Sequence, residues 1–248
     1  MIRKIVNLTP GLPPQQLALE EALLESAQLR GRDTLRIWIN DRAIIIGRSQ
    51  SAALETDLDR AMKLRIPVIR RISGGGTVYH YPGNLNVSLY LSDGRWLGGV
   101  EEAFSRLGEV FAAALSRLGI KTRLKENGLF IGKKKVAGAA QARRANSLAY
   151  HSTLLLEPSA GLMRELLSAM RPNYTPSIVP SQPHPTTTLT ERIPGSLHHE
   201  VVIQAISTEL AGRLTRSLVP GGLQAEEINR SMELARLKYG SSNWNQYR

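Results

Sequence analysis

Residues 70–80 read Arg-Arg-Ile-Ser-Gly-Gly-Gly-Thr-Val-Tyr-His, and their residue types could hold a ligand. Three consecutive glycines lack Cβ atoms, so a ligand can lie against the backbone and positive φ angles are accessible. Backbone N–H groups exposed in such a turn suit a phosphate or a carboxylate, and an arginine adds a planar fork of donors. Taken alone, the segment is better explained as a glycine-rich hairpin with a solvated arginine pair, so the rest of the chain must decide.

A run of three lysines at 133–135 forms a second such stretch. Runs of this kind are usually solvated hairpin turns, and short strands are expected on both sides, at 129–131 and 136–139. Lys135 directly precedes the second strand, so it begins that strand rather than lying at the top of the turn. This position favours Lys135 over its two neighbours as a functional side chain.

Hydrophobic periodicity indicates which elements position these residues. Residues 14–30 are expected to form a helix with an apolar stripe and with Glu20, Glu21 and Glu25 on its solvated side. Further helices are expected at 57–65, 99–118, 197–218 and 224–239. Further strands are expected at 35–39, 43–46, 67–71, 77–79, 85–91, 120–124 and 150–156. Strands in hairpins with interspersed helices predict an α+β fold with a mixed, largely antiparallel sheet flanked by helices.

The composition limits the class of protein. The chain has 248 residues, 42% of them hydrophobic, which suits one domain over residues 1–248. The formal charge of +11 raises nucleic-acid binding as a hypothesis, but no nucleic-acid-binding motif is present and aromatic residues make up only 5%. No apolar run is long enough to span a bilayer, and the first residues lack the apolar core of a signal peptide. We therefore expect a cytoplasmic protein that binds neither membranes nor nucleic acid.

The composition of the chain changes at residues 171–190, which contain five prolines together with serine and threonine. A segment of this length without a helix or strand is usually a mobile functional element such as a lid. A surface excursion explains it equally well, so both interpretations stand.

Three segments, in this order, resemble the lipoate–protein ligase A family, which is related to biotin ligases and octanoyltransferases. Residues 70–84 are similar to the family signature of two arginines, a serine, a glycine triplet, a histidine and Gly-Asn. Asn127 with residues 135–141 is similar to its Asn…Lys-(Ile/Val)-(Ser/Ala)-Gly-(Ser/Ala) stretch. Residues 151–155, His-Ser-Thr-Leu-Leu, are similar to its His-Gly-Thr-Leu-Leu. The resemblance implies a biotin/lipoate protein ligase-like catalytic domain.

The resemblance also implies a reaction. Lipoate or octanoate attacks the α-phosphate of ATP, with Mg²⁺, and gives an acyl-adenylate and pyrophosphate. A lysine of an acidic acceptor, either a lipoyl domain or a glycine-cleavage H protein, then takes the acyl group as an amide. The matching family lysine contacts both carboxylate and phosphate, so Lys135 is the expected catalytic residue. Residues 171–190 occupy the position of the family's adenylate-binding loop.

The residues expected to bind ATP and the acyl-adenylate lie in the matching segments, and Arg48 is a further candidate contact. They are Arg71, Ser73, Gly74, Gly75, Gly76, Thr77, Val78, Tyr79, His80, Asn84, Asn127, Lys135, Gly138, Ala139, His151 and Thr153. The glycine backbone and Arg71 are expected to donate to phosphate, where developing charge makes preorganised donors most effective. The two histidines and two asparagines have an equally good explanation as residues that hold strands or turns.

Some features depart from the family pattern. Tyr81 stands where the family usually has aspartate, and Tyr150-His151-Ser152 replaces a paired-histidine motif, which bears on acyl-chain or acceptor choice. The chain ends near the close of the family's catalytic domain, without the C-terminal accessory domain of many members. Some members, notably archaeal ones, work with a separate small accessory protein, and the resemblance leaves open whether this chain needs one.

The absence of cysteine separates the reaction classes. Related octanoyltransferases and lipoyl amidotransferases pass the acyl group through an enzyme thioester, which needs a thiolate, whereas an adenylate-forming ligase needs no covalent enzyme intermediate. Two alternatives stay open: a cysteine-free octanoyl or lipoyl transferase, and a non-catalytic subunit that binds lipoyl proteins or nucleic acid. Biotin ligation is disfavoured because no Gly-Arg-Gly-Arg-like loop is present. The five histidines show no metal-binding spacing, so no metal is expected beyond the Mg²⁺ that accompanies ATP.

Overall fold

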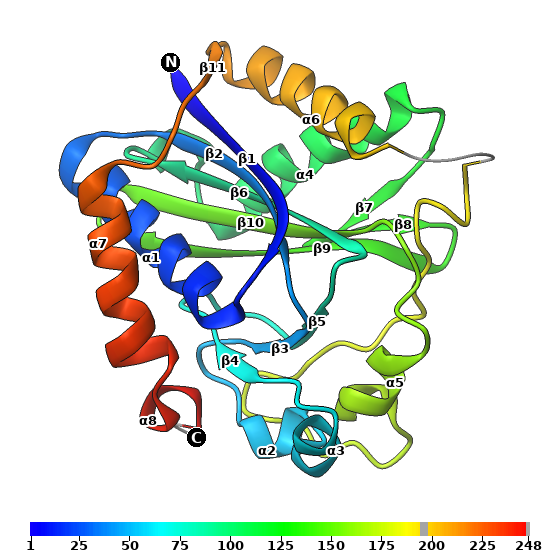
Figure 1. Ribbon diagram of the computed structural model, residues 1–248. Coiled ribbons are helices and arrows are strands. Elements are labelled where there is room, and N and C mark those ends of the chain that lie inside the picture. The colour runs from blue at the N-terminus through cyan, green and yellow to red at the C-terminus, as the bar shows by residue number, and fades with distance from the viewer. Residues whose placement is uncertain (194–197, 247–248) are drawn as a thin grey trace.

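The computed structural model describes residues 1–193 and 198–246 and places most strands in one large sheet (Figure 1). The strand order is β11-β1-β2-β6-β10-β9-β8-β7. The strands are β1 (Ile2–Gly11), β2 (Thr34–Asn40), β6 (Asn84–Leu91), β7 (Arg123–Lys125), β8 (Gly128–Ile131), β9 (Lys134–Arg144), β10 (Ser147–Leu155) and β11 (Leu218–Pro220). β1 pairs in parallel with β2 and β11, and the other pairs are antiparallel. The predicted mixed, largely antiparallel sheet is confirmed.

A second sheet of three strands lies below the first in Figure 1. Its central strand β3 (Ala43–Ile46) pairs in parallel with β4 (Val68–Arg70) and antiparallel with β5 (Val78–His80). Residues 71–77, here called the glycine-rich loop, therefore connect the two strands on either side of β3. Short helices border this sheet: α2 (Ala52–Glu55), α3 (Leu58–Lys63), α5 (Leu162–Leu166) and the 3₁₀ turn Ser168–Met170.

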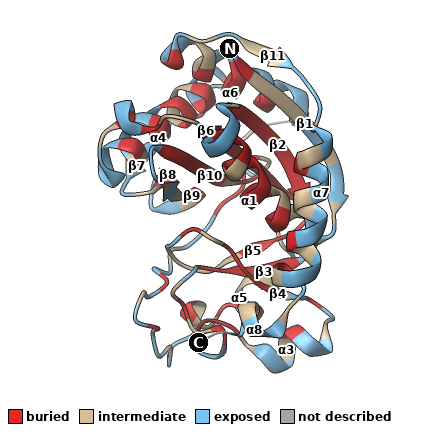
Figure 2. Ribbon diagram, turned by 90° about the vertical axis from the view of Figure 1, so that its left-hand side faces the viewer, coloured by how far each residue is buried: buried red, intermediate tan, exposed pale blue. Residues whose placement is uncertain are grey.

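Four longer helices cover the large sheet. α4 (Val100–Arg117) and α6 (His199–Leu214) pack together over one face, and α1 (Pro13–Arg30) and α7 (Ala225–Leu234) over the other (Figure 1). The main core lies under α4 and α6, and Figure 2 shows the central strands buried. Smaller elements are the 3₁₀ turn Arg95–Leu97, the π-helical turn Ala235–Tyr239 and α8 (Ser242–Asn245). Among the described residues, no helix has the length and apolarity needed to cross a membrane.

The structure corrects several expected elements. No strand is expected at β1, because charged residues interrupt its apolar pattern and its place in the sheet depends on backbone pairing with β2 and β11. The strand expected at 120–124 forms later, as β7, and the one at 136–139 is part of the longer β9. The helix expected at 197–218 is α6, whose end is followed by β11; residue 197 lies outside the described residues. The helix expected at 224–239 forms as α7 and ends in the π-helical turn.

The correction with most consequence concerns helix α1. The sequence pattern places Glu20 and Glu21 on its solvated side, but each is only 3% exposed. The helix packs against the sheet on one side and against α7 and the π-helical turn on another, so little of it faces water. Glu21 pairs with Arg144 and with Lys238, whose Nζ lies 2.7 Å away. Glu20 instead points toward the candidate site.

Candidate active site

The candidate site occupies the face of the large sheet that α1 also covers. In an antiparallel ladder, directly opposite residues share a face, so the register sets out rows of side chains across the sheet. The two central rows are Trp38–Asn86–Thr153–Gly138 and Arg36–Ser88–His151–Ala140. β9 contributes only glycine and alanine to these rows, which leaves open space above that strand.

A cavity of about 870 Å³ opens between this face, the glycine-rich loop and residues 179–186. The predicted site residues that line it are Arg71, Gly75, Gly76, Thr77, Val78, Tyr79, His80, Asn127, Lys135, Gly138, Ala139, His151 and Thr153. Ser73, Gly74, Asn84 and Arg48 are not among the described residues that line it. Asn84 instead caps a turn, where its Oδ1 accepts from the Tyr81 N–H at 3.0 Å. The structure therefore brings most, but not all, of the predicted residues together.

The Arg71 guanidinium holds the glycine-rich loop from within. Its Nη2 donates to the carbonyl oxygens of Gly74 and Gly76 at 2.5 and 2.8 Å. Its Nη1 donates to the Ile45 carbonyl at 3.1 Å, and its Nε donates to Ser73 Oγ at 2.9 Å. Burial lowers the pKa of Arg71 to about 10, so the group stays charged at neutral pH. Four of the five guanidinium N–H groups are used in these bonds, so Arg71 fixes the loop, and because it also lines the cavity its role as a phosphate donor stays a prediction.

The loop that follows β3 supports the glycine-rich loop from the other side. Gly75 has a φ of +85°, which side chains rarely adopt. Its carbonyl oxygen would lie 2.0 Å from a Cβ at Gly47, so the two loops touch backbone to backbone. Arg70 adds a second clamp, because its Nη1 donates to the carbonyls of Gly47, Arg48 and Gln50. Residues 47–50 therefore support the glycine-rich loop that lines the site.

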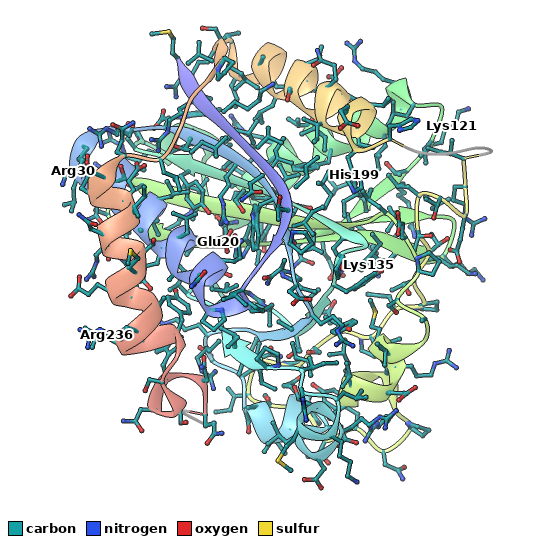
Figure 3. The ribbon with its side chains drawn as sticks, in the orientation of Figure 1. Glu20, Arg30, Lys121, Lys135, His199 and Arg236 are labelled. Carbon is teal, nitrogen blue, oxygen red and sulfur yellow. The ribbon has the colours of Figure 1, made fainter. Side chains whose placement is uncertain are left out.

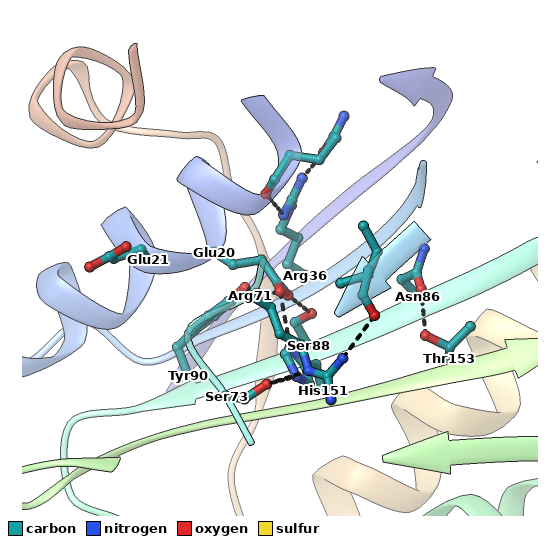
Figure 4. A network of polar contacts seen from close by, with 12 residues as sticks. Glu20, Glu21, Arg36, Arg71, Ser73, Asn86, Ser88, Tyr90, His151 and Thr153 are labelled. Atoms are coloured by element: carbon teal, nitrogen blue, oxygen red, sulfur yellow. Dashed lines mark hydrogen bonds and ion pairs between the residues drawn. The ribbon is translucent and has the colours of Figure 1, made fainter. Parts of the chain in front are cut away.

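His151 lies between helix α1 and the glycine-rich loop (Figure 4). Its Nδ1 is 2.9 Å from Oε2 of Glu20, and its Nε2 is 2.7 Å from Oγ of Ser73. Burial works to raise the pKa of Glu20, but His151, Arg36 and the hydrogen bond from Ser88 outweigh it and lower this pKa to about 2. Glu20 is therefore ionised. Its carboxylate accepts a hydrogen bond from His151, whose Nδ1 must carry the proton.

The order Ser73, His151, Glu20 is that of a serine-hydrolase triad, but the surroundings differ. In a triad the serine oxygen is presented to a substrate carbonyl. Here Ser73 is 1% exposed, and its Oγ already accepts from Arg71. The three residues therefore form a positioning chain that connects α1, β10 and the glycine-rich loop.

The other predicted histidine, His80, is a buried neutral ring. Burial lowers its pKa to about 3. Thr153 Oγ1 donates to Asn86 Oδ1 at 2.8 Å, so His80 Nε2, 3.0 Å from the same hydroxyl, must be the donor in their hydrogen bond. His80 Nδ1 then accepts from Asn40 Nδ2 at 3.2 Å. Asn86 lines the cavity, and its buried Nδ2 has no hydrogen-bond partner among the described residues.

Lys135 reaches the site face because of a β-bulge. Strand alternation counted back from Gly138 would turn Lys135 to the opposite face of the sheet. The register between β8 and β9 shifts at this point, and Lys135 lies opposite Phe130, on the face of Gly138. Its stem crosses Gly128, where a Cβ would lie 2.7 Å from Lys135 Cε. Figure 3 labels Lys135, which lies at the start of β9 and forms a backbone bridge with Thr186.

The Lys135 ammonium forms no hydrogen bond or ion pair with any residue in the described part of the chain. Burial lowers its pKa, and the charge of Glu126 opposes that effect. Its backbone N–H donates to the Pro185 carbonyl at 2.7 Å, and its own carbonyl accepts from the Thr187 N–H at 3.0 Å. A partly desolvated cation that faces a cavity can bind an anionic group of a ligand.

Residues 171–190 contain no helix or strand and dock on the glycine-rich loop through Ser181. Ser181 Oγ donates to Glu55 Oε2 at 2.6 Å and accepts from the Thr77 N–H at 2.9 Å and from Gln50 Nε2 at 3.1 Å. Glu55 is fully buried, and its other oxygen accepts from the Tyr174 hydroxyl at 2.7 Å. The segment therefore forms one wall of the cavity, held by polar contacts rather than by an apolar core.

Sequence reasoning missed Glu20, Trp38 and Asn86, all of which line the cavity. Glu20 follows Leu17 by three residues and precedes Leu24 by four, which is the spacing of one helix face. That spacing is a signal that Glu20 shares the buried stripe. Trp38 and Asn86 carry no such signal, because only the pairing of β2 with β6 places them opposite each other.

Comparisons with known proteins agree on one family. Residues 13–211 match the family model described as the lipoyl protein ligase A/B catalytic domain. The chain is 40% identical over 164 residues to an Aeropyrum pernix protein provisionally named lipoate-protein ligase A, a match over 66% of this chain and 61% of that protein. It is 28% identical to lipoate-protein ligase A subunit 1 of Thermoplasma acidophilum, over 98% of this chain and 95% of that one. The match with the first of these relatives thus spans less than two thirds of its length.

Two solved structures superpose with a TM-score of 0.85 at 27% identity. One is a T. acidophilum protein with bound lipoic acid, and the match covers 100% of this chain and 99% of that one. The other is a lipoate-protein ligase A bound with ATP, and the match covers 99% and 98%.

Proposed function

This chain belongs to the lipoyl protein ligase A/B catalytic-domain family, and on that premise we propose that it is a lipoate–protein ligase. It activates lipoate, or octanoate, with ATP and transfers the acyl group to a lysine of an acceptor protein. The observation that carries this proposal is the Lys135 ammonium, which has no partner among residues 1–193 and 198–246 and faces a cavity of about 870 Å³ beside a glycine-rich loop. We further propose that residues 1–248 form one catalytic domain and act in the cytoplasm.

In the first step, a carboxylate oxygen of the acid bonds to the α-phosphorus of ATP, and the bond to pyrophosphate breaks. Two anions must approach each other, so the step needs a cation between them. Lys135 supplies it from a flexible stem. The backbone of Gly75 and Gly76 lines the same cavity, and Arg71 holds it in shape for the phosphate. Preorganised donors of this kind each contribute on the order of 3 kcal/mol to such a step.

In the second step, the neutral ε-amine of an acceptor lysine attacks the acyl carbonyl carbon. An amide bond forms, the bond to AMP breaks, and the amine loses its proton. The acyl chain lies along the apolar part of the cavity wall, which includes Leu17, Trp38 and Ile45. The Asn86 amide and the Tyr79 hydroxyl are polar groups of cavity-lining residues that have no hydrogen-bond partner among the described residues.

Mg²⁺ enters this reaction as part of the substrate, bound to the phosphates of ATP. Magnesium in nucleotide sites keeps several waters and takes only one or two protein carboxylates. Within the described ranges, no group of three or more metal-ligating side chains exists. Glu20, Glu101 and Glu126 line the cavity, and Glu20 is already committed to His151. The residues present therefore fit a metal carried by the nucleotide.

The acceptor is proposed to be a lipoyl domain or a glycine-cleavage H protein. A relative that matches nearly the whole chain is named as subunit 1 of its ligase, which supports a second, accessory subunit for this chain as well. That subunit would be required for adenylate formation and dispensable for transfer from a preformed adenylate.

Mass spectrometry of an apo lipoyl domain tests these proposals together. One tube holds the protein, ATP, Mg²⁺ and lipoate, and a parallel tube holds the protein and synthetic lipoyl-AMP. Modification in both tubes would establish a self-sufficient ligase. Modification from lipoyl-AMP alone would establish a transfer subunit. No modification in either tube would contradict the proposed function.

Ser181→Ala is expected to increase hydrolytic leakage of the adenylate several-fold. The change removes the hydrogen bonds that join residues 171–190 to Thr77, Gln50 and Glu55, so water reaches the mixed anhydride more often. The measurement is the ratio of free AMP to modified acceptor, starting from lipoyl-AMP. Ile178→Ala on the same segment is the matched control, because that side chain is 89% exposed. Equal leakage in the two variants would show that the segment is no lid.

A further inference from the structure

The outermost strand of the large sheet carries exposed cations beside the mouth of the cavity. β7 is last in the strand order, so its outer edge has no partner strand in the described structure. Five exposed side chains at this end of the sheet form what we call the basic edge: Lys121 before β7, Arg123 and Lys125 on β7, Lys133 in the turn between β8 and β9, and Lys134 at the start of β9. Figure 3 shows Lys121 and Lys135 on the same side of the molecule, opposite Arg30 and Arg236.

The register directs part of the basic edge toward the site. Arg123 lies opposite Phe130 and Lys125 opposite Gly128, and Gly128 lies opposite Gly138 of β9. Opposite residues share a face, so these two cations lie on the site face of the sheet, the face to which the bulge turns Lys135. The row that begins inside the cavity at Trp38 therefore ends at the sheet edge in Lys125.

The charge of this region is almost entirely positive. Residues 121–135 contain six lysines and arginines and a single acidic residue, Glu126. Glu126 lies 3.8 Å from Lys125 and lines the cavity, so the turn between β7 and β8 is at the mouth. Burial lowers the pKa of His184 on the opposite wall, and the charges of Lys135 and Lys125 lower it further. Lys135 and Lys125 are therefore close enough to this wall of the cavity to act on its charge, although Glu126 opposes them.

We propose that the basic edge is the docking surface for the acceptor, an acidic folded domain whose target lysine enters the cavity over Lys135. This inference rests on the proposed function, because transfer requires a macromolecule to sit at the entrance. Cations on an edge strand discourage backbone pairing with another strand. We therefore expect a partner to bind this edge through the charges of its side chains. Complementary charge at such a rim acts mainly on the rate and the specificity of association.

A double charge reversal tests the proposal with a matched control. Arg123→Glu with Lys133→Glu changes the basic edge, and Lys63→Glu with Arg236→Glu changes the net charge equally at exposed sites elsewhere. Transfer from synthetic lipoyl-AMP to an acidic apo lipoyl domain is measured at several salt concentrations. The edge variant is expected to lose about tenfold in kcat/KM for the acceptor at low salt. The loss should shrink as salt rises, and the control should stay near wild type.

Three results would overturn the docking proposal while leaving the ligase function intact. The first is equal kcat/KM in the edge and control variants. The second is weaker calorimetric binding of lipoyl-AMP itself to the edge variant, because the edge would then serve the nucleotide. The third is a change in sedimentation coefficient confined to the edge variant, because the edge would then join copies of this chain. A wild-type protein that transfers nothing would instead contradict the proposed function.

Discussion

Lys135→Ala is expected to lower the rate of adenylate formation by about 10²- to 10³-fold, the size typical for loss of one preorganised charge at a reacting anion. The ammonium faces the cavity with no partner among the described residues, so its removal costs the fold little and the reaction much. Lipoate-dependent exchange of pyrophosphate into ATP measures the step directly. If adenylate formation needs an accessory subunit, the exchange is measured with that subunit added.

Lys133→Ala is the matched control for this substitution. Lys133 has the same side chain two positions away, but it is exposed in the turn between β8 and β9. In pyrophosphate exchange, which involves no acceptor protein, the control should retain the wild-type rate, and both variants should unfold at the wild-type denaturant midpoint. Near wild-type turnover of Lys135→Ala would remove Lys135 from the mechanism.

Glu20→Gln is expected to lower the free energy of unfolding at neutral pH by about 3 kcal/mol. The pKa of Glu20 is about 2 in the folded protein against 4.5 for an unperturbed glutamate, and each unit corresponds to about 1.4 kcal/mol. The substitution leaves the charges of Arg36 and Arg71 without their buried counterion. Urea denaturation measures the loss, and Glu233→Gln is the control, because that side chain is half exposed.

The pH dependence of this loss has a defined sign. A carboxyl group whose pKa falls on folding contributes its full stability above its unfolded pKa and loses it as pH falls toward its folded pKa. The difference between wild type and Glu20→Gln should therefore be constant above about pH 5 and shrink between pH 4.5 and about 2. A difference that stays constant down to pH 2 would show that Glu20 is not the ionised partner.

The same substitution should change which ring nitrogen of His151 carries the proton. The hydroxyls of Ser88 and Tyr90 donate to Oε1 of Glu20, so a glutamine whose oxygen stays at that position presents its N–H to His151. Nδ1 then becomes the acceptor, and the proton moves to Nε2. Nε2–H then points at Ser73 Oγ, which already accepts from Arg71. Nitrogen-15 NMR of the labelled histidines distinguishes the two tautomers. An unchanged tautomer with a large loss of stability would mean that Glu20 acts on the fold alone.

Local patterns predicted most of the elements around the site. The helix of residues 14–30 and the strands at 43–46 and 85–91 appear where periodicities of 3.6 and 2 place them. Such periods depend only on residues that are close in the sequence, so they can be recognised without knowledge of the fold. β1 could not be found this way, because its order comes from pairing with β2 and with the distant β11.

The direction of individual side chains could not be predicted. Glu20 looks like a solvated helix residue until a sheet and a second helix cover it. The sequence does not show that Arg71 also holds its own loop, through carbonyl oxygens of Ile45, Gly74 and Gly76. Alternation would turn Lys135 away from the site, and only the β-bulge turns it back. Each outcome depends on packing or register between segments that are far apart in the chain.

The sequence by itself determined the α+β fold, the family and the segments that carry the site, because these follow from local periods and contiguous motifs. The lack of cysteine also excluded a thioester route. Only the tertiary structure decided which side chains meet. Glu20 and His151 are 131 positions apart, and their contact exists because α1 crosses the face of the sheet to which β10 turns that histidine. The hydrogen bonds around the cavity therefore depend on how distant segments pack together, and local sequence patterns do not reveal that packing.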